Sequence, residues 1–375
     1  LTVTESGRVM DSLHNMTTAH DLLLATEARL SSALEVKRSD PEFLANLPAV
    51  AARVSGMVAA PLAGFGVPRA LGSSYSGGQR GDAARIDTAS CSNEISAEEQ
   101  RCMVGDIEKW VLPSEGVCIT VVWIRRPKTS TIARHGSTSE HITPPSRPAI
   151  VVLSARTESA NGSDISNALW RELSQPNASK QHPAILVTVN LCGTGETGPQ
   201  SRSVPYSAAE SPSIRIEKPG PGHLGGDNGE GTQGMPRFLG RSTVGVHAGE
   251  IARVLEFLST RADIDQVKAL VALDHTGPAA LHALVADAGN ARNASEPSLA
   301  VVGSVSSYAS IVRARDYATP SSIDITGVLS HYDLTDLNAY LAPRPQLILH
   351  PRNPTLDPLN ATEAAIEFAS VRAQY

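Results

Sequence analysis

The sequence contains few aromatic residues and no long apolar run. Phe, Trp and Tyr make up 4% of its 375 residues, while 41% of the residues are hydrophobic, so a core has to be built mainly from Ala, Val, Leu and Ile. No stretch approaches the ~18 consecutive apolar residues of a membrane-spanning helix, and the first residues do not show the order of a signal peptide. We therefore expect one large or two modest globular domains without a membrane span.

An excess of positive charge and the cysteine spacing of a metal site are also missing. The net charge is −6 and the basic residues are scattered, which argues against a nucleic-acid partner. The four cysteines form no C-x-x-C pair, and no cluster of His, Asp and Glu has ligand spacing, so we expect no metal. Free buried thiols are the simplest interpretation, and a Cys91–Cys102 bridge is the alternative.

A glycine motif at residues 193–198 has the G-x-G-x-x-G spacing of a dinucleotide-binding loop. It follows an apolar segment that we predict to be a strand, which is the context that such a site requires. A helix would also have to open after the motif, because its N-terminus holds the pyrophosphate. Residues 199–205 are polar and irregular instead, so we expect no cofactor.

The stretch at residues 267–288 is the one around which the rest of the chain is arranged. Residues 267–273 form an apolar run as long as a buried strand, and residues 278–288 are rich in Ala and Leu, which favours a helix. Between them lies the polar turn Asp274-His275-Thr276-Gly277. A buried strand, a sharp turn and an apolar helix form the layout that raises a nucleophile above a sheet.

From residue 149 onwards, predicted strands and helices alternate. That order indicates an α/β fold with a mostly parallel sheet and helices on both faces. The predicted strands cover residues 149–153, 184–189, 267–273, 299–305 and 346–350, after a hairpin at 107–112 and 117–125; the predicted helices cover residues 165–173, 244–258, 278–288, part of 323–341, and 361–371.

The N-terminal part has a different pattern. Helical periodicity is found at residues 17–36 and 41–57, and residues 59–89 are rich in Gly, Pro and Ser, which indicates a linker. We therefore expect an N-terminal helical extension and linker at residues 1–89 and a main domain at residues 90–375.

Five segments occur in an order that is found in one enzyme family. They are Asn190-Leu191-Cys192-Gly193-Thr194-Gly195-Glu196-Thr197, residues 238–245, residues 307–312, residues 331–337 and residues 341–349. Together they resemble the acetyl xylan esterase-like branch of the α/β-hydrolases, which is related to the prolyl-oligopeptidase-like hydrolases. The first 31 residues resemble the linker that leads to the second hydrolase domain in tandem members of that family.

The resemblance implies an α/β-hydrolase-like main domain, carboxylic-ester hydrolysis and a secreted or periplasmic location. It also implies that the natural partner is an active hydrolase domain or subunit, as in the tandem members. The expected ligand is a small ester or a glycan such as an acetylated polysaccharide.

The catalytic places of that family are altered in this chain. Laid on the fingerprint G-x-S-x-G, Thr276 takes the Ser place, while Asp274 and Pro278 take the Gly places. The family's acid would fall near Asn353, with Asp357 four residues later. The family's base would follow one further strand beyond the last predicted helix, where this sequence stops.

These changes favour a degenerate hydrolase domain that is non-catalytic by itself. The oxyanion-loop dipeptide H-G is also replaced, by Ser154-Ala155, so all four catalytic features are lost together. One alternative is an active carboxylic-ester hydrolase, and another is a module that binds a glycan or a small ligand. The candidate catalytic residues of the active alternative are Thr276 as nucleophile, His275 or His350 as base, and Asp357 or Asp333 as acid.

Overall fold

The structure is a computed structural model that describes residues 18–58, 69–74, 106–113, 119–127, 146–154, 168–169, 172–173, 184–194, 197, 240–288 and 297–375. The structural statements below concern these residues. Some predicted features fall wholly or partly outside them. They include the Cys91–Cys102 bridge, Gly195 and Gly198 of the glycine motif, Ala155, most of the helix predicted at residues 165–173, and most of the linker predicted at residues 59–89.

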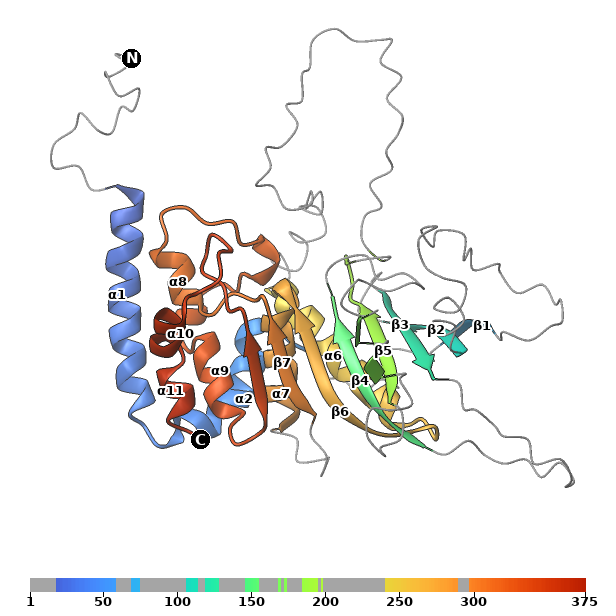
Figure 1. Cartoon of the computed structure of the whole chain (residues 1–375). Helices are drawn as coiled ribbons and strands as arrows, with labels where there is room; N and C mark the ends of the chain where they lie inside the picture. The colour runs from blue at the N-terminus through green and yellow to red at the C-terminus, as the bar shows by residue number, and fades with distance from the viewer. Residues whose placement is uncertain are drawn as a thin grey trace, which may run out of the picture.

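A sheet of eight strands, in the order β1-β2-β3-β5-β4-β6-β7-β8, forms the centre of the described part (Figure 1). Strands β1, β2, β3 and β5 pair antiparallel in succession, and β5, β4, β6, β7 and β8 run parallel. The predicted α/β fold is confirmed. The strands are β1 (Arg69–Ser74), β2 (Asp106–Pro113), β3 (Ile119–Arg126), β4 (Arg147–Leu153), β5 (Ile185–Asn190), β6 (Ile264–Leu273), β7 (Ser298–Val302) and β8 (Gln346–Leu349).

The longer helices follow the predicted segments closely. Figure 1 shows α1 and α8 to α11 at one end of the sheet and β1 and β2 at the other. The helices are α1 (Ala19–Arg38), α2 (Glu42–Ser55), α6 (Thr243–Ser259), α7 (Gly277–Ala288), α8 (Tyr308–Arg313), α9 (Leu334–Tyr340), α10 (Ala361–Glu367) and α11 (Ala369–Arg372).

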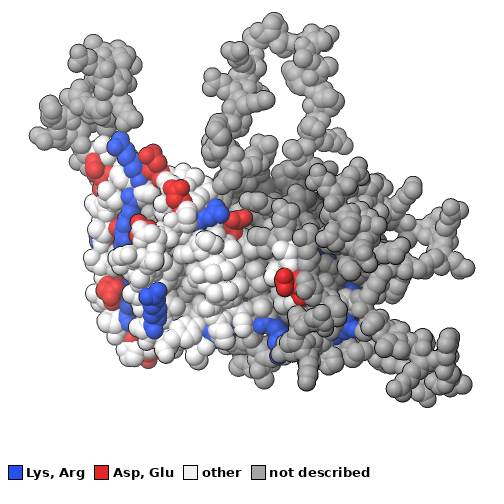
Figure 2. Space-filling view, in the orientation of Figure 1, with Lys and Arg blue, Asp and Glu red and all other residues white. Residues whose placement is uncertain are grey.

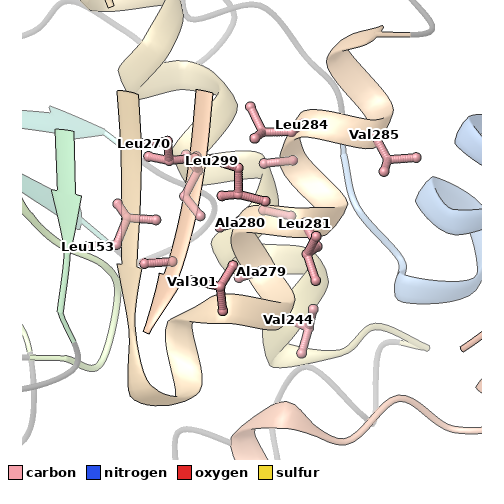
Figure 3. Packing of buried hydrophobic residues seen from close by; sticks show 14 of the residues in the cluster. Leu153, Val244, Leu270, Ala279, Ala280, Leu281, Leu284, Val285, Leu299 and Val301 are labelled. Carbon is pink, nitrogen blue, oxygen red and sulfur yellow. The ribbon is translucent and has the colours of Figure 1, made fainter. Parts of the chain in front are cut away.

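The two faces of the sheet bury different side chains because successive residues of a strand point to opposite sides. In β4, Val151 and Leu153 belong to the large cluster beneath α6 and α7, while Ile150 and Val152 face a smaller cluster on the other side. Figure 3 shows α7 lying with its Ala and Leu side chains over the large cluster. The buried face of this helix is built from alanine, leucine and valine, as the low aromatic content requires.

Helix α2 packs into the same core as the sheet. Its Leu47 and Ala51 are buried in the large cluster. A Cβ on Gly245 of α6 would lie 2.1 Å from the carbonyl oxygen of Ser55, so the absence of a side chain allows α6 to touch the end of α2. The proposed division into residues 1–89 and 90–375 stays a prediction, but α2 is part of the main core.

The interpretation of residues 59–89 as a linker needs a correction, because β1 lies within it. Residues Arg69–Ser74 pair antiparallel with β2, with a register shift between Ala70 and Gly72. The segment RALGSS has weak strand propensity, so local sequence did not reveal it. Hydrogen bonding to the edge of β2 decides its conformation instead.

The predicted hairpin is confirmed as β2 and β3, and four charged side chains tie it to the turn before β6. Arg126 contacts Glu108 at 2.9 Å and Asp263 at 2.7 Å. Arg261 contacts the same two carboxylates at 3.0 and 2.9 Å. Burial by itself raises the pKa of Glu108 and Asp263, but hydrogen bonds from the arginines outweigh it and hold both pKa values below their ordinary range.

The surface of the described part carries interspersed charge. Figure 2 shows Lys and Arg side chains scattered among Asp and Glu on the visible face, without a large area of one sign. None of the described helices is long and apolar enough to cross a membrane. The described residues also contain no group of three or more His, Cys, Asp or Glu side chains that could hold a metal ion.

Candidate functional site

The candidate site lies where the sheet connections diverge, at the carboxyl ends of β4 and β6. The chain leaves β4 to form β5 on one side, and it leaves β6 to form β7 on the other side. A crevice between two such neighbouring strands is where ligands bind in open α/β sheets. The stretch at residues 267–288 therefore occupies the place where a site is expected.

The strand, turn and helix predicted for this stretch are confirmed. β6 ends at Leu273, a single 3₁₀ turn covers Asp274–Thr276, and α7 begins at Gly277. Asp274 has a φ of 52°, a left-handed conformation that non-glycine residues adopt rarely and at some cost. The sharp bend is therefore at Asp274, two positions before the residue that the sequence pattern puts in the Ser place.

Thr276 is turned into the protein. This residue is only 1% exposed. Its hydroxyl lies 2.8 Å from the carbonyl oxygen of Leu273 and 3.3 Å from that of Leu153. Carbonyl oxygens only accept, so the hydroxyl donates its proton to the ends of β6 and β4. Thr276 thus links two neighbouring strands to the start of α7.

An ion pair lies over the bend. Asp274 Oδ1 is 3.6 Å from Arg352 Nη2, and both side chains are about one third exposed. Gly303 lies beneath this pair, because a Cβ at Gly303 would meet Asp274 Oδ1 at 3.1 Å and Arg352 Nη2 at 3.3 Å. The backbone N–H of Arg352 donates to the Ser304 carbonyl at 2.8 Å. The loop after β8 is thereby fixed to the loop after β7 and to the bend after β6.

Comparison with solved structures identifies the fold. One match is a protein from Bacteroides fragilis NCTC 9343 that carries the assignment acetyl xylan esterase. Its TM-score is 0.54 at 13% identity, and the match covers 100% of this chain and 82% of that chain. The chain has an α/β-hydrolase fold. At this identity the likeness concerns the fold and not the chemistry.

Further α/β-hydrolase-like matches have lower scores. An acetyl xylan esterase from Paenibacillus sp. R4 has a TM-score of 0.44 at 14% identity, over 88% of this chain and 85% of that one. A CE15 glucuronoyl esterase from Teredinibacter turnerae T7901 has a TM-score of 0.46 at 12% identity, over 88% and 72%. No family model and no curated protein matches the chain.

Of the two candidate bases, His275 lies in the bend and His350 lies away from it. His275 follows Asp274 directly and is half-buried. His350 is exposed and comes directly after β8, which β7 separates from β6. Leu273, Val302 and Leu349 stand in one row across these three strands. His350 therefore lies two strands away from the bend.

The candidate acids have partners of their own. Asp357 is exposed, and its carboxylate accepts a hydrogen bond of 2.7 Å from the Thr355 hydroxyl within the same loop. Asp333 is buried and caps α9. Its carboxylate accepts four hydrogen bonds, from the Ser307 hydroxyl and from the backbone N–H groups of residues 308, 309 and 334. Burial raises the pKa of Asp333 in spite of these donors.

A buried histidine that the sequence analysis did not single out lies behind the bend, on α7. His282 Nδ1 is 2.6 Å from the Pro278 carbonyl oxygen, so this nitrogen carries the proton and donates. Nε2 then accepts from the Tyr332 hydroxyl at 2.9 Å. Burial lowers the pKa of His282 to about 4, so the ring is neutral at pH 7. In the sequence, the signal that could have pointed to His282 was a single histidine within an otherwise apolar helical segment.

Two side chains of helix α6 hold the loop after β5 by hydrogen bonds to the backbone of Cys192. Glu250 Oε2 accepts from the Cys192 backbone N–H at 2.8 Å, and His247 Nε2 donates to the Cys192 carbonyl oxygen at 2.8 Å. Cys192 is in a disulfide, so the expectation of a free thiol is wrong for this residue. The other three cysteines lie outside the described residues. The glycine motif begins here as a turn, and Gly193 has a φ of 75°.

Proposed function

We propose that this chain is a non-catalytic α/β-hydrolase domain that supports or completes a carboxylic-ester hydrolase assembly. The observation that carries the proposal is the orientation of Thr276. A nucleophilic hydroxyl has to face the substrate and give its proton to a base. The Thr276 hydroxyl faces inward and gives its proton to carbonyl oxygens.

The groups that would activate a nucleophile also support this proposal. A histidine base needs a nitrogen that can take a proton near neutral pH, and the pKa of about 4 makes His282 a poor one. His350 lies two strands from the bend. Asp333 is surrounded by four donors, none of which is a histidine.

The ion pair between Asp274 and Arg352 is consistent with a structural role for the bend. It joins the turn after β6 to the loop after β8, where the family resemblance puts the catalytic acid at Asn353. Asn353 accepts hydrogen bonds from Thr355 and from the Asp357 backbone instead, at 2.8 and 2.9 Å. An amide there supplies no charge to stabilise an imidazolium.

A domain of this kind would serve an active hydrolase domain or subunit as a structural or binding partner. A small ester or a glycan is the ligand class that fits the fold neighbour from Bacteroides fragilis, which carries the assignment acetyl xylan esterase. The family resemblance favours a secreted or periplasmic location.

Hydrolysis and covalent labelling test the proposal. The purified chain is expected to show negligible turnover of p-nitrophenyl acetate and no covalent labelling by a fluorophosphonate probe. Stoichiometric labelling of any Ser or Thr would refute it. Mass spectrometry of the intact protein locates the label, and an active serine esterase treated in parallel is the positive control.

Substitution of Thr276 separates a structural role from a catalytic one. Thr276→Val removes the hydroxyl but keeps the shape, and it is expected to lower the free energy of unfolding by about 1–2 kcal/mol. Thr276→Ser keeps the hydroxyl and is the control, with a smaller loss. If turnover is measurable and Thr276→Ala reduces it by about 10³-fold or more, the active alternative with Thr276 as nucleophile is correct.

A further inference from the structure

Backbone strain is concentrated in the connections that follow β6 and β8. The non-glycine residues with a positive φ in the described part of the chain are Asp274, His350 and Leu356, at 52°, 48° and 68°. This conformation is unfavourable for such residues and persists only where the surroundings hold it in place. Strain of this kind is typical of active sites and ligand clamps. The carboxyl edge of the neighbouring strands β6, β7 and β8 (Figure 1) therefore has the backbone of a binding site.

The strained residue of the bend after β6 carries an accessible carboxylate. The nucleophile of an α/β-hydrolase lies on the sharp, strained turn between strand and helix, so that its side chain is exposed above the sheet. In this chain the strained residue is Asp274, whereas Thr276 is buried and faces inward. The Asp274 side chain is 31% exposed. A carboxylate thus occupies the place where the fold presents its reactive group.

Arg352 reaches this carboxylate from the far side of β7. Because β7 lies between β6 and β8, the two side chains meet over Gly303, the first residue after β7. A Cβ at Gly303 would lie 3.1 Å from Asp274 Oδ1 and 3.3 Å from Arg352 Nη2, so a glycine here lets them approach. The Arg352 backbone donates to the Ser304 carbonyl at 2.8 Å and accepts from the Ser306 N–H at 3.2 Å. These bonds fix the base of the arginine side chain.

The guanidinium of Arg352 is only partly engaged by the protein. Its Nη2 lies 3.6 Å from Asp274 Oδ1, beyond the usual length of a hydrogen bond, and the side chain forms no hydrogen bond with another described residue. Arg38 and Arg261, by contrast, contact their carboxylates at 2.7 and 2.9 Å. The Arg352 side chain is 30% exposed, so donors remain available to a ligand. A planar guanidinium with available donors suits a carboxylate, which accepts two parallel hydrogen bonds.

We propose that Arg352 and Asp274 bind a small organic carboxylate that carries a hydroxyl group on the neighbouring carbon. The carboxylate of the ligand accepts hydrogen bonds from the guanidinium, and the hydroxyl donates to the Asp274 carboxylate. Asp274 repels a negative charge, so the hydroxyl contact favours this class over a simple carboxylate, and a phosphate dianion is repelled more strongly. The site gives the binding role proposed above its residues and its ligand class, and in this respect it rests on that role.

Three matched compounds and inorganic phosphate test the ligand class. L-Lactate has both groups, propionate lacks the hydroxyl, and lactamide lacks the charge. Calorimetric titration of the purified chain with each of them, at low ionic strength, measures the dissociation constants. We expect lactate to bind with a dissociation constant on the order of 1 mM. Propionate and phosphate should bind more weakly, and lactamide should not bind.

Substitutions at the two residues locate the site. Arg352→Gln should weaken lactate binding by about tenfold or more, and Arg352→Lys, which keeps the charge but not the planar fork, should restore only part of the affinity. Asp274→Asn is compatible with the left-handed conformation and removes the charged acceptor, so the preference for lactate over propionate should disappear. Arg372→Gln, at an exposed arginine of α11, is the matched control and should leave the affinities unchanged. Thermal unfolding shows whether each variant keeps its fold.

Three results would overturn the proposal. Absence of lactate binding up to about 100 mM would exclude the ligand class. Wild-type affinity in a folded Arg352→Gln variant would place the binding elsewhere. Tighter binding of phosphate than of lactate would show that the site selects a different anion. Ester turnover or fluorophosphonate labelling, in contrast, would refute the proposed non-catalytic role and would leave the titration results unchanged.

Discussion

Single buried polar residues connect the elements behind the bend. His282 on α7 binds the Tyr332 hydroxyl, which in turn lies 3.5 Å from the Ala51 carbonyl oxygen of α2. Three segments that are far apart in sequence therefore meet at the Tyr332 hydroxyl. The His282 ring is neutral, since burial penalises its charged form, and both of its nitrogens have partners.

The lowered pKa of His282 makes stability depend on pH. The unfolded chain binds a proton at this residue below pH ~6.5, while the native chain does so only near its pKa of about 4. The unfolded state therefore holds more protons in this window, and the free energy of unfolding falls as the pH falls through it. We expect this residue to account for a loss of about 3 kcal/mol between pH 7 and pH 4.

Urea denaturation of wild type and His282→Gln at several pH values measures this contribution. Glutamine is neutral throughout, so the difference in free energy between the two proteins should shrink as the pH falls. His20→Gln, at the start of α1, is the control and should preserve the pH dependence of the wild type. A constant difference between pH 7 and pH 4 would show that His282 does not titrate in this way.

Among the secondary-structure elements, α1 is held in an unusual way. Leu34 is its one buried apolar residue, Leu30 packs partly buried against the large cluster, and charged side chains supply further contacts. Arg38 binds the Asp336 carboxylate with hydrogen bonds of 2.7 and 2.9 Å, and Arg313 contacts Glu27 at 2.7 Å. The face of α1 that points away from the protein carries exposed Leu22 and Val36. Charged contacts therefore position this helix more than apolar packing does.

Removing the Arg38 guanidinium should loosen α1. Asp336 is buried and would keep only its hydrogen bond from the Asp333 backbone, so Arg38→Gln should cost about 1–3 kcal/mol. Arg29→Gln changes an exposed arginine of the same helix and should cost less than 0.5 kcal/mol, or about the usual surface effect. Thermal unfolding of both variants provides the comparison. Equal effects of the two substitutions would contradict the role of the Arg38 ion pair.

At the scale of the whole molecule, α2 and the sheet share one core, while α1 lies on its outside. Leu47 and Ala51 of α2 are as deeply buried as the strand residues of the large cluster. A shared core is expected to unfold as one cooperative unit. If the N-terminal part up to residue 89 were a separate domain, α2 would unfold independently of the sheet, and this can be measured.

Hydrogen exchange in native conditions can measure that consequence. The amides of α2 should exchange at the rate of global unfolding, together with those of β6 and α7. The amides of α1 should exchange faster, because α1 can detach without exposing the core. An independent N-terminal domain would show α1 and α2 exchanging together and separately from the sheet.

The sequence by itself determined the fold class and most of the elements. Apolar runs at residues 184–189 and 267–273 and the Ala-rich segment at residues 278–288 follow local rules of periodicity and burial, so strand, turn and helix were predicted where the structure has them. β1 escaped this approach, because its pairing with β2 and not its own composition makes it a strand.

Only the tertiary structure decided what the candidate site contains. The one-dimensional pattern put Thr276 in the place of a nucleophile, but its hydroxyl faces the carbonyl oxygens of Leu273 and of Leu153, and Leu153 is more than a hundred residues away. The pairing of Asp274 with Arg352 and of His282 with Tyr332 likewise joins distant segments. Local patterns specify which side chains are available, and the packing of the sheet determines which of them meet.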